Sequence, residues 1–219
     1  MIRSAVHLPI AFLALVAILF TGQAHSALFP ILGGTMVYDD DRDITWLADA
    51  NYAQTSGFDA DGLMTWADAN AWADSLVFGG FSNWRLPSAK KADGTGPDFS
   101  FGGGEMSHLF YDEFQGSFDF PASLASDPNN YLALFDNLQN NPVGQDGFYW
   151  YTETYDPIPI FAWCFSMHAG GTCANDKTKG FYAWAVLDGN ASLVPIPATV
   201  WLFGSGLIGL FGFARKSKK

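Results

Sequence analysis

The sequence predicts an α+β domain, with an antiparallel sheet and one main amphipathic helix, between a signal peptide and a C-terminal transmembrane helix. Three observations predict this architecture. The last third of the chain alternates aromatic and small residues in short runs, which is typical of strands. One earlier segment has helical apolar spacing behind an N-terminal capping motif. Both ends of the chain carry apolar runs beside basic residues.

Two short strands are expected at the start of the domain. Gly33 and Gly34 mark a turn before the first strand, Thr35–Tyr38. An acidic turn, DDDRD, then separates it from the second strand, Ile44–Leu47. The segment therefore predicts a β-hairpin with its charges at the turn.

The clearest helix is expected in LMTWADANAWADSLVFGG, from Leu63 to Gly80. Thr65 and Asp68 form a capping box, in which side chains satisfy backbone donors of the first turn. We expect Gly79-Gly80 to end the helix. One apolar face follows from the spacing of Ala69, Trp72, Ala73 and Leu76.

After this helix we expect an extended segment, FSNWRLPS, up to Pro87, and then a loop from Ser88 to Gly104 that is rich in Lys, Asp, Gly, Pro and Ser. Short helices are expected in EMSHLFYDEF and around Tyr131–Leu138. The remaining strands are expected in FYWYTET, FAWCFSM and FYAWAVLDG.

Residues 1–26 are typical of a secretory signal peptide. Arg3 precedes an apolar run, Leu8–Phe20, and small residues lead to an expected cleavage after Ser26. The run of 13 residues is shorter than the roughly 20 residues that a spanning helix needs. An uncleaved N-terminal anchor is the alternative.

Residues 194–219 combine a stiff proline motif, 17 uncharged residues from Ala198 to Ala214 and a basic cluster. The uncharged run is near the lower length limit for a helix that crosses about 30 Å of hydrocarbon. Basic clusters normally stay on the cytoplasmic side. The residues concerned are Val194, Pro195 and Pro197 in the proline motif, and Arg215, Lys216, Lys218 and Lys219 in the basic cluster.

This order of motif, apolar span and basic cluster resembles the PEP-CTERM-type sorting signals of Gram-negative bacteria. The resemblance implies cleavage near the proline motif by an exosortase, a membrane cysteine protease-transpeptidase associated with exopolysaccharide and biofilm production. The motif here lacks the Glu that names the family, and a permanent anchor is the alternative. Both ends together predict export across the inner membrane to the cell surface or extracellular matrix, with membrane anchoring until the tail is cleaved.

The charge of the domain, residues 27–193, excludes nucleic acid as a partner. All 22 acidic residues of the chain lie in it against six basic residues, so its net charge is −16. Phosphates require a basic footprint, and sulfated polysaccharide is disfavoured for the same reason. Solubility outside the cell or bound divalent cations would explain the acidity. The six basic residues are Arg42, Arg85, Lys90, Lys91, Lys177 and Lys179.

The two cysteines, Cys164 and Cys173, are expected to form a disulfide because the region that contains them is exported. Closing this short loop would stabilise the fold by roughly 2–3 kcal/mol. A catalytic thiol or a metal-binding pair is the alternative, but the sequence has no CxxC motif to support it.

Six segments that run through the domain in order resemble the Lcl C-terminal domain family, named after a collagen-like bacterial adhesin. The segments are GTMVYDDDRDITWL, DADGLMTWADANAWADSL, NWRLP, EMSHLFYDE, FYWYTET and FYAWAVLDG. The residues that carry the family motif are Trp66, Trp72, Trp84, Arg85, Leu86, Pro87 and Trp184.

The family is similar to C-type-lectin-like and formylglycine-enzyme-like folds, whose terminal strands pair. We therefore expect Thr35–Tyr38 beside Phe181–Val186. The resemblance also implies adhesive carbohydrate binding, although the named member binds sulfated glycans and this chain lacks the basic surface that they need.

Two acidic clusters are candidate calcium sites. In GFDADGLMTWAD, the candidate ligands Asp59, Asp61 and Asp68 fall at positions three, five and twelve of an EF-hand-like loop, but Gly57 stands at the first position. The alternative is that these residues organise and cap the helix. In the acidic turn, the candidate ligands are Asp39 and Asp41, and the alternatives are solvation or pairing with Arg42.

Two further features are expected to be structural. Arg85 is expected to pair with a carboxylate and brace the fold rather than bind a ligand. Aromatic residues at strand spacing are expected in the core, with stacking on sugars as the alternative. These residues are Tyr149, Trp150, Tyr151, Trp163, Tyr182 and Trp184.

The sequence does not predict an enzyme. It contains no nucleophile, metalloprotease, phosphate-binding or dinucleotide-binding fingerprint. Outside the signal peptide only His108 and His168 are available as general bases. We therefore expect an exported surface or biofilm-matrix protein that binds extracellular polysaccharide, with calcium as a candidate cofactor. A purely structural matrix protein and a polysaccharide hydrolase are the alternatives.

Overall fold

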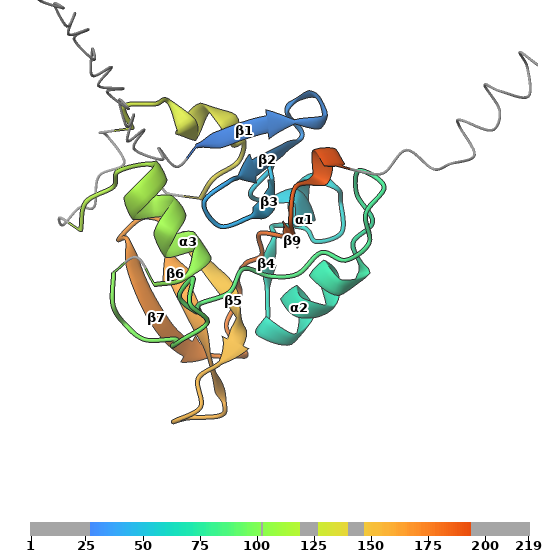
Figure 1. Cartoon of the computed structure of the whole chain (residues 1–219). Helices are drawn as coiled ribbons and strands as arrows, with labels where there is room; N and C mark the ends of the chain where they lie inside the picture. Colours follow the sequence, from blue (N-terminus) through green and yellow to red (C-terminus); the bar gives the residue numbers. More distant parts are fainter. Residues whose placement is uncertain (1–26, 102, 119–126, 140–146, 194–219) are drawn as a thin grey trace, which may run out of the picture.

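The computed structural model describes residues 27–101, 103–118, 127–139 and 147–193, which form an α+β domain with two β-sheets (Figure 1). The strands are β1 (Leu28–Ile31), β2 (Met36–Asp39), β3 (Ile44–Leu47), β4 (Leu63–Met64), β5 (Phe148–Thr154), β6 (Phe161–Ser166), β7 (Gly171–Asp176), β8 (Phe181–Tyr182) and β9 (Val186–Asp188). The α-helices are α1 (Tyr52–Thr55), α2 (Trp66–Ser75) and α3 (Glu105–His108). A π-helical turn, η2 (Leu109–Glu113), continues α3, and η1 (Leu32–Gly34), η3 (Tyr131–Leu134) and η4 (Ala191–Leu193) are 3-10 helices.

The predicted α+β class with antiparallel sheets is confirmed. One sheet has the order β1-β2-β3-β9 and is antiparallel throughout. The other has the order β4-β8-β5-β6-β7 and is antiparallel except between β5 and β8. In Figure 1 the first sheet lies above the second, and α2 lies to one side of both.

None of the helices in these residue ranges has the length and apolar character needed to cross a membrane. The predicted signal peptide, residues 1–26, and the predicted sorting signal, residues 194–219, both lie outside the described residues.

The N-terminal sheet contains the predicted hairpin but differs from the expected strand order. The strands β2 and β3 pair as predicted, with Asp39 opposite Ile44 at the turn. The expected pairing of Thr35–Tyr38 with Phe181–Val186 is wrong, because β1 and β3 occupy the two edges of β2. Strand β9 instead pairs with β3. Strand β1 was not predicted, and its edge position tolerates Pro30, which has no backbone N–H.

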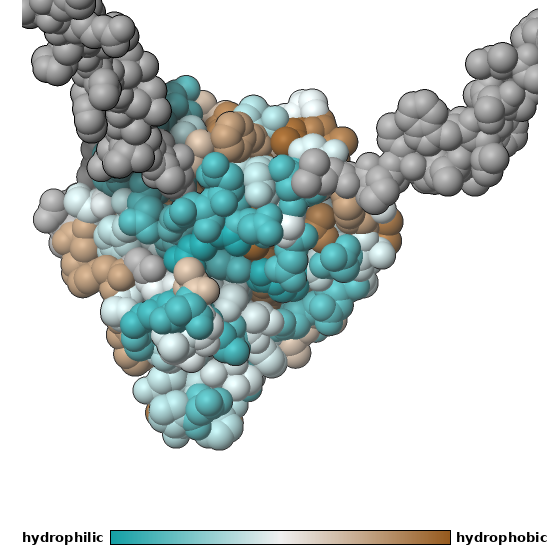
Figure 2. All heavy atoms as spheres, viewed as in Figure 1, coloured by the Kyte–Doolittle hydropathy of each residue, from teal (hydrophilic) through white to brown (hydrophobic). Residues whose placement is uncertain are grey.

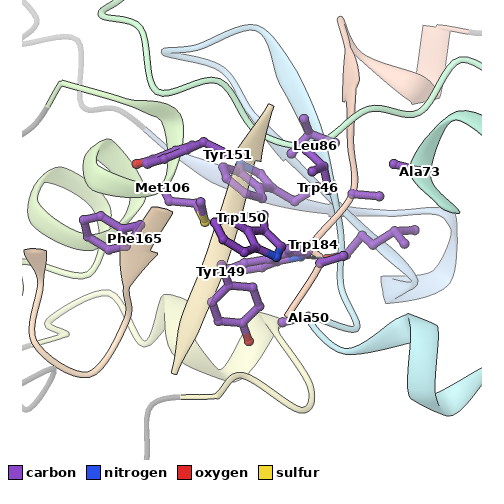
Figure 3. Close-up of a cluster of buried hydrophobic side chains, with 14 of the residues drawn as sticks. Trp46, Ala50, Ala73, Leu86, Met106, Tyr149, Trp150, Tyr151, Phe165 and Trp184 are labelled. Carbon is purple, nitrogen blue, oxygen red and sulfur yellow. Dashed lines mark hydrogen bonds between the residues drawn. The ribbon is translucent and has the colours of Figure 1, made fainter. Parts of the chain in front are cut away.

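The segment Phe181–Asp188 belongs to both sheets, because β8 lies in the second sheet and β9 in the first. Between these strands, Trp184 is fully buried and its Nε1 donates a hydrogen bond to the carbonyl of Leu47 over 2.8 Å. The Trp184 ring lies 4.7 Å from that of Trp46 on β3 and 5.7 Å from that of Tyr149 on β5. Figure 3 shows these rings in the common core of the domain.

The other predicted core aromatics are buried as well, apart from one. Tyr149, Trp150, Tyr151 and Trp163 are buried, and Tyr182 is half-buried. Of the family-motif residues, Trp72, Trp84, Leu86 and Pro87 are buried, and Trp66 is half-buried. The core interpretation of these aromatics is therefore confirmed.

Helix α2 begins where the capping box predicts. The Thr65 hydroxyl accepts a hydrogen bond from the Asp68 N–H over 3.3 Å and donates one to Asp68 Oδ2 over 2.6 Å. The buried face of the helix consists of Ala69, Trp72 and Ala73, which pack in the core.

The predicted end of this helix at Gly79-Gly80 is wrong, because α2 stops at Ser75 and Leu76 is extended. The two glycines instead form a turn in which Phe78 and Phe81 exchange two backbone hydrogen bonds of 3.0 Å. Both glycines have positive φ, as the central residues of such a tight turn require. They lie too far beyond Ser75 to cap the end of α2.

The predicted disulfide joins Cys164 to Cys173, which face each other across β6 and β7. Strand β7, with the sequence GTCAND, was not predicted because it has no aromatic residue and only one β-branched residue, Thr172, to mark a strand. Its pairing with β6 and the disulfide hold it in the sheet.

Gly62 is held in a conformation that only glycine adopts easily. Its φ is +81°, and a Cβ at this position would lie 2.0 Å from Oδ1 of the buried Asn51. Gly57 has a similar φ of +76°, but nothing lies within 4 Å of its Cβ position. An alanine would therefore have similar backbone strain at either position, but only at position 62 would its Cβ also be crowded.

We predict that Gly62→Ala lowers the free energy of unfolding by about 2–5 kcal/mol, because overpacking adds to backbone strain. The matched variant Gly57→Ala should lose only about 1–2 kcal/mol, from strain alone. Urea denaturation of both variants measures the difference. Equal losses would contradict the steric role of Asn51.

Candidate functional site

Arg85 links three segments that are distant in the sequence. Its backbone N–H and carbonyl pair with Val186 over 2.9 and 2.8 Å, which places its side chain between α3 and β9. Nη1 and Nη2 donate to the two carboxylate oxygens of Glu105, both over 2.8 Å, and Nε donates to Asp188 over 3.0 Å. Burial lowers the pKa of Arg85, but these two carboxylates outweigh it and raise the pKa above its usual value. The predicted pairing of Arg85 with carboxylates is confirmed.

The loop that follows Arg85 is fixed at its start by two carboxylates. Glu105 also accepts a hydrogen bond from the N–H of Ser88 over 2.7 Å. Glu153 accepts from the Ser88 hydroxyl over 2.6 Å and from the N–H of Ala89 over 2.8 Å. Gly104 closes the loop so tightly that a Cβ there would lie 2.8 Å from Cα of Ala89. The start of the loop is therefore anchored both to α3 and to β5.

An open groove of about 470 Å³ lies beside these anchors, and we call it the polar groove. Its charged lining residues are Asp41, Arg42, Arg85, Lys90, Lys91, Glu105, Glu153 and Asp188. The hydroxyl residues Ser88 and Thr152 also line it. Four of the six basic residues of the domain therefore meet four carboxylates in one groove. In Figure 2, hydrophilic residues gather on this face over the region between α3 and β9.

A second, smaller hollow of about 290 Å³ is lined by residues 96–99 of the same loop and by Tyr155, Asp156, Pro157 and Trp163, and we call it the aromatic pocket. Phe99, which is 56% exposed, lies 4.7 Å from the ring of Trp163 and 5.9 Å from that of Tyr155. Lys91 of the polar groove and Asp98 of the aromatic pocket form an ion pair of 2.7 Å, so the two hollows adjoin. The hydrogen bond from Lys91 lowers the pKa of Asp98 to about 2.

A cluster of ionisable side chains is buried under the β2–β3 turn. Asp39, His108 and Glu113 are each at most 3% exposed, and one potential ligand atom from each lies within 4.8 Å of the other two. In the described parts of the chain, no other three acidic, histidine or cysteine residues meet in this way. Nδ1 of His108 lies 2.8 Å from Oδ2 of Asp112.

The charged groups of this cluster shift one another's pKa values. Burial raises the pKa of Asp39 to about 6, although the charge of His108 opposes the shift. Burial lowers the pKa of His108, but the hydrogen bond with Asp112 and the nearby carboxylates of Glu113 and Asp39 outweigh it and raise the pKa to about 9. The surrounding carboxylates therefore favour the imidazolium form of His108.

No protein family, curated protein or solved structure matches this chain.

The three acidic residues of the EF-hand-like segment do not bring their carboxylate oxygens close enough together for one metal ion, although Asp59 and Asp68 line the same hollow. Asp59 Oδ1 accepts hydrogen bonds from the N–H groups of Asp61 and Gly62 over 3.1 and 2.8 Å. Asp61 Oδ1 accepts from the N–H of Leu63 over 3.0 Å, and Asp68 caps α2. These carboxylates organise the turn and the helix entrance, which is the alternative that the sequence left open.

The four carboxylates of the acidic turn divide into two pairs with different partners. Asp40 accepts a hydrogen bond from the N–H of Ala27, and Asp43 accepts one from the hydroxyl of Tyr38. The candidate ligands Asp39 and Asp41 both approach His108, with Oδ2 atoms 3.8 and 3.7 Å from Nε2.

The sequence interpretation missed His108 and Glu113 as partners of Asp39. They lie on α3 and η2, far from the turn in the sequence, so only the tertiary fold brings them to it. The one local signal was the pair His108 and Asp112 within a predicted short helix, where residues four apart share a face.

We predict that Glu105→Gln lowers the free energy of unfolding by about 2–4 kcal/mol, because it leaves the half-buried Arg85 without its bidentate partner. The side chain of Glu105 is 11% exposed, whereas that of Asp188 is 73% exposed. Asp188→Asn, the matched variant on the other side of Arg85, should therefore cost less than about 1 kcal/mol. Guanidinium denaturation tests the order, and a larger loss in Asp188→Asn would contradict it.

Proposed function

We propose that this protein is an exported surface or biofilm-matrix protein whose domain binds extracellular polysaccharide, without catalysis, in the polar groove and the adjoining aromatic pocket. The observation that carries the proposal is the concentration of four of six basic residues in one groove of a domain with a net charge of −16. Elsewhere the acidic surface repels polyanions. In the groove the charges balance, so a neutral or weakly acidic chain can approach.

The chemistry of the two hollows suits sugars. The ammonium group of Lys90, the carboxylate of Asp41 and the hydroxyl of Thr152, which line the groove, are donors and acceptors for sugar hydroxyls. The exposed ring of Phe99 provides an apolar surface on which a sugar face can stack. An extended polysaccharide would cross both hollows, since the Lys91–Asp98 ion pair is their common wall.

The carboxylates of the groove support binding better than hydrolysis. Both oxygens of Glu105 are engaged by Arg85, and one also accepts from Ser88. Both oxygens of Glu153 are engaged by Ser88 and Ala89. A glycosidase needs one carboxylic acid and one carboxylate directed at the substrate. Carboxylates that hold the loop in place are not available for that role.

Export is proposed on the signal peptide and on the PEP-CTERM-type tail, which imply the secretion machinery and an exosortase as partners. The Cys164–Cys173 disulfide supports the proposal, because disulfides persist in oxidising compartments outside the cytoplasm.

A C-type-lectin-like fold, as in the Lcl C-terminal domain family, is proposed on the motif residues of that family. The two most specific segments of the resemblance, Trp84–Pro87 and Tyr182–Val186, lie side by side through the backbone pair of Arg85 and Val186. This proximity supports the interpretation of both segments as one structural unit.

We predict that Lys90→Ala and Phe99→Ala each weaken polysaccharide binding about three- to tenfold, because each removes roughly 1 kcal/mol of contact free energy. The matched controls are Lys179→Ala and Phe29→Ala, which alter an exposed lysine and an exposed phenylalanine outside both hollows. A glycan array with neutral, uronic-acid-containing and sulfated polysaccharides identifies the ligand, and thermophoresis measures the variants.

We expect signals from neutral or uronic-acid-containing polysaccharides and none from sulfated ones. A blank array would instead favour a purely structural matrix protein. Turnover of the bound polysaccharide, lost in Glu153→Gln, would favour the hydrolase.

We also predict that the secreted form lacks residues 1–26 and the residues beyond Ala198, because a signal peptide and a sorting motif flank the domain. Intact-mass spectrometry of protein collected outside the cell measures both ends. A secreted form that retains the basic cluster at residues 215–219 would contradict cleavage of the tail.

A further inference from the structure

Two buried polar atoms under the β2–β3 turn have no hydrogen-bond partner in the described structure. They are Oδ2 of Asp39 and Nε2 of His108, and they face each other over 3.8 Å. Glu113 Oε1 approaches the same nitrogen at 3.3 Å. Leaving such atoms without partners in the interior costs roughly 1–3 kcal/mol each, so their convergence on one point indicates a ligand.

The spacing of these atoms matches the first shell of a metal ion. Two ligands on a tetrahedral zinc ion, each bonded at about 2.0–2.1 Å, lie about 3.3 Å apart. The three potential ligand atoms of Asp39, His108 and Glu113 lie within 4.8 Å of one another, so small side-chain adjustments would bring all three to bonding distance.

The second nitrogen of His108 is oriented as metal-binding histidines require. Nδ1 lies 2.8 Å from Oδ2 of Asp112, one helical turn further along the chain. A carboxylate on Nδ1 fixes the ring and leaves Nε2 as the atom that can bind a metal. Here Nε2 points at Asp39 and Glu113.

The charges around His108 also favour a divalent cation. Four carboxylates approach the imidazole, from Asp39, Asp41, Asp112 and Glu113. The positive charge of Arg42 also acts on the ring, and its backbone N–H donates to Oδ1 of Asp39. An imidazolium neutralises one of these carboxylates, whereas a divalent ion neutralises two and leaves the ring neutral.

We propose that Asp39, His108 and Glu113 bind one divalent transition-metal ion, with Asp41 as a further oxygen ligand and Asp112 as the partner that orients His108. Zinc and manganese fit a set of one imidazole and several carboxylates, whereas calcium takes oxygen ligands only. The metal is therefore of a different class from the calcium expected at Asp39 and Asp41. Since Asp39, His108 and Glu113 are buried, the ion has a structural role and ties the β2–β3 turn to α3 and η2.

The test uses the full chain, stripped with a chelator, dialysed and then titrated with zinc, manganese or calcium chloride. We expect one zinc or manganese ion per chain by elemental mass spectrometry, and calorimetric affinity at least tenfold tighter than for calcium. Glu113→Gln and His108→Gln should each weaken binding at least tenfold. His168→Gln is the matched control and should bind like the native chain, because His168 lies outside the cluster.

A second measurement leaves the proposed ligands intact, so it tests the proposal even if Glu113→Gln or His108→Gln does not fold. Pulsed electron paramagnetic resonance of the manganese-loaded His168→Gln chain, freed of its signal peptide, should show nitrogen coupling from one imidazole, which only His108 can supply. Absence of uptake, tighter binding of calcium than of zinc, binding unchanged in Glu113→Gln, or manganese without nitrogen coupling would each overturn the proposal and leave an imidazolium among carboxylates. None of these outcomes depends on polysaccharide binding.

Discussion

The fold depends on the burial of Trp184 in a segment that gives one strand to each sheet. Phe181–Asp188 supplies β8 to the second sheet and β9 to the first, and both strands are very short. Strands of two or three residues contribute few hydrogen bonds, so they need a common core to hold them. Trp184 provides it through contacts with Trp46 and Tyr149 and through the hydrogen bond of its indole N–H to Leu47. The two sheets therefore stabilise each other through one buried ring.

The same segment determines the shape of the polar groove. Val186 pairs with the backbone of Arg85, and Asp188, two residues on, pairs with the Arg85 side chain. Glu105 then connects Arg85 to the start of the loop at Ser88. The described residues of the loop have no regular secondary structure, so its position rests on these charged contacts rather than on a hydrogen-bond ladder. Arg85, Glu105 and Asp188 thus hold the loop and the groove in place. Lys90, which also lines the groove, has no ion pair among the described residues.

The sequence predicted those elements that are determined by residues close to one another in the chain. The hairpin at β2 and β3, the start of α2 at Thr65 and the short helix at α3 all follow from turns, caps and spacing within a few residues. The disulfide and the pairing of Arg85 followed from residue chemistry. The missed features depend on tertiary partners instead. Strand β7 is polar and becomes a strand only beside β6, and β9 joins β3 because β2 is already paired on both edges. His108 meets Asp39 only after α3 has packed under the turn.

The acidity of the domain has more causes than solubility. Several aspartates, such as Asp59, Asp98 and Asp176, accept hydrogen bonds from nearby backbone N–H groups and so replace secondary structure in the loops. Glu105 and Glu153 hold the loop of the polar groove, and Asp39 and Glu113 surround His108 in the interior. A carboxylate suits all three tasks because it accepts several hydrogen bonds and pairs with cations. Because the structural carboxylates already outnumber the basic residues, a net negative charge follows from how this loop-rich fold is held together. The net negative charge therefore disfavours polyanions as partners but does not identify a partner, whereas the uneven placement of the few basic residues points to the polar groove.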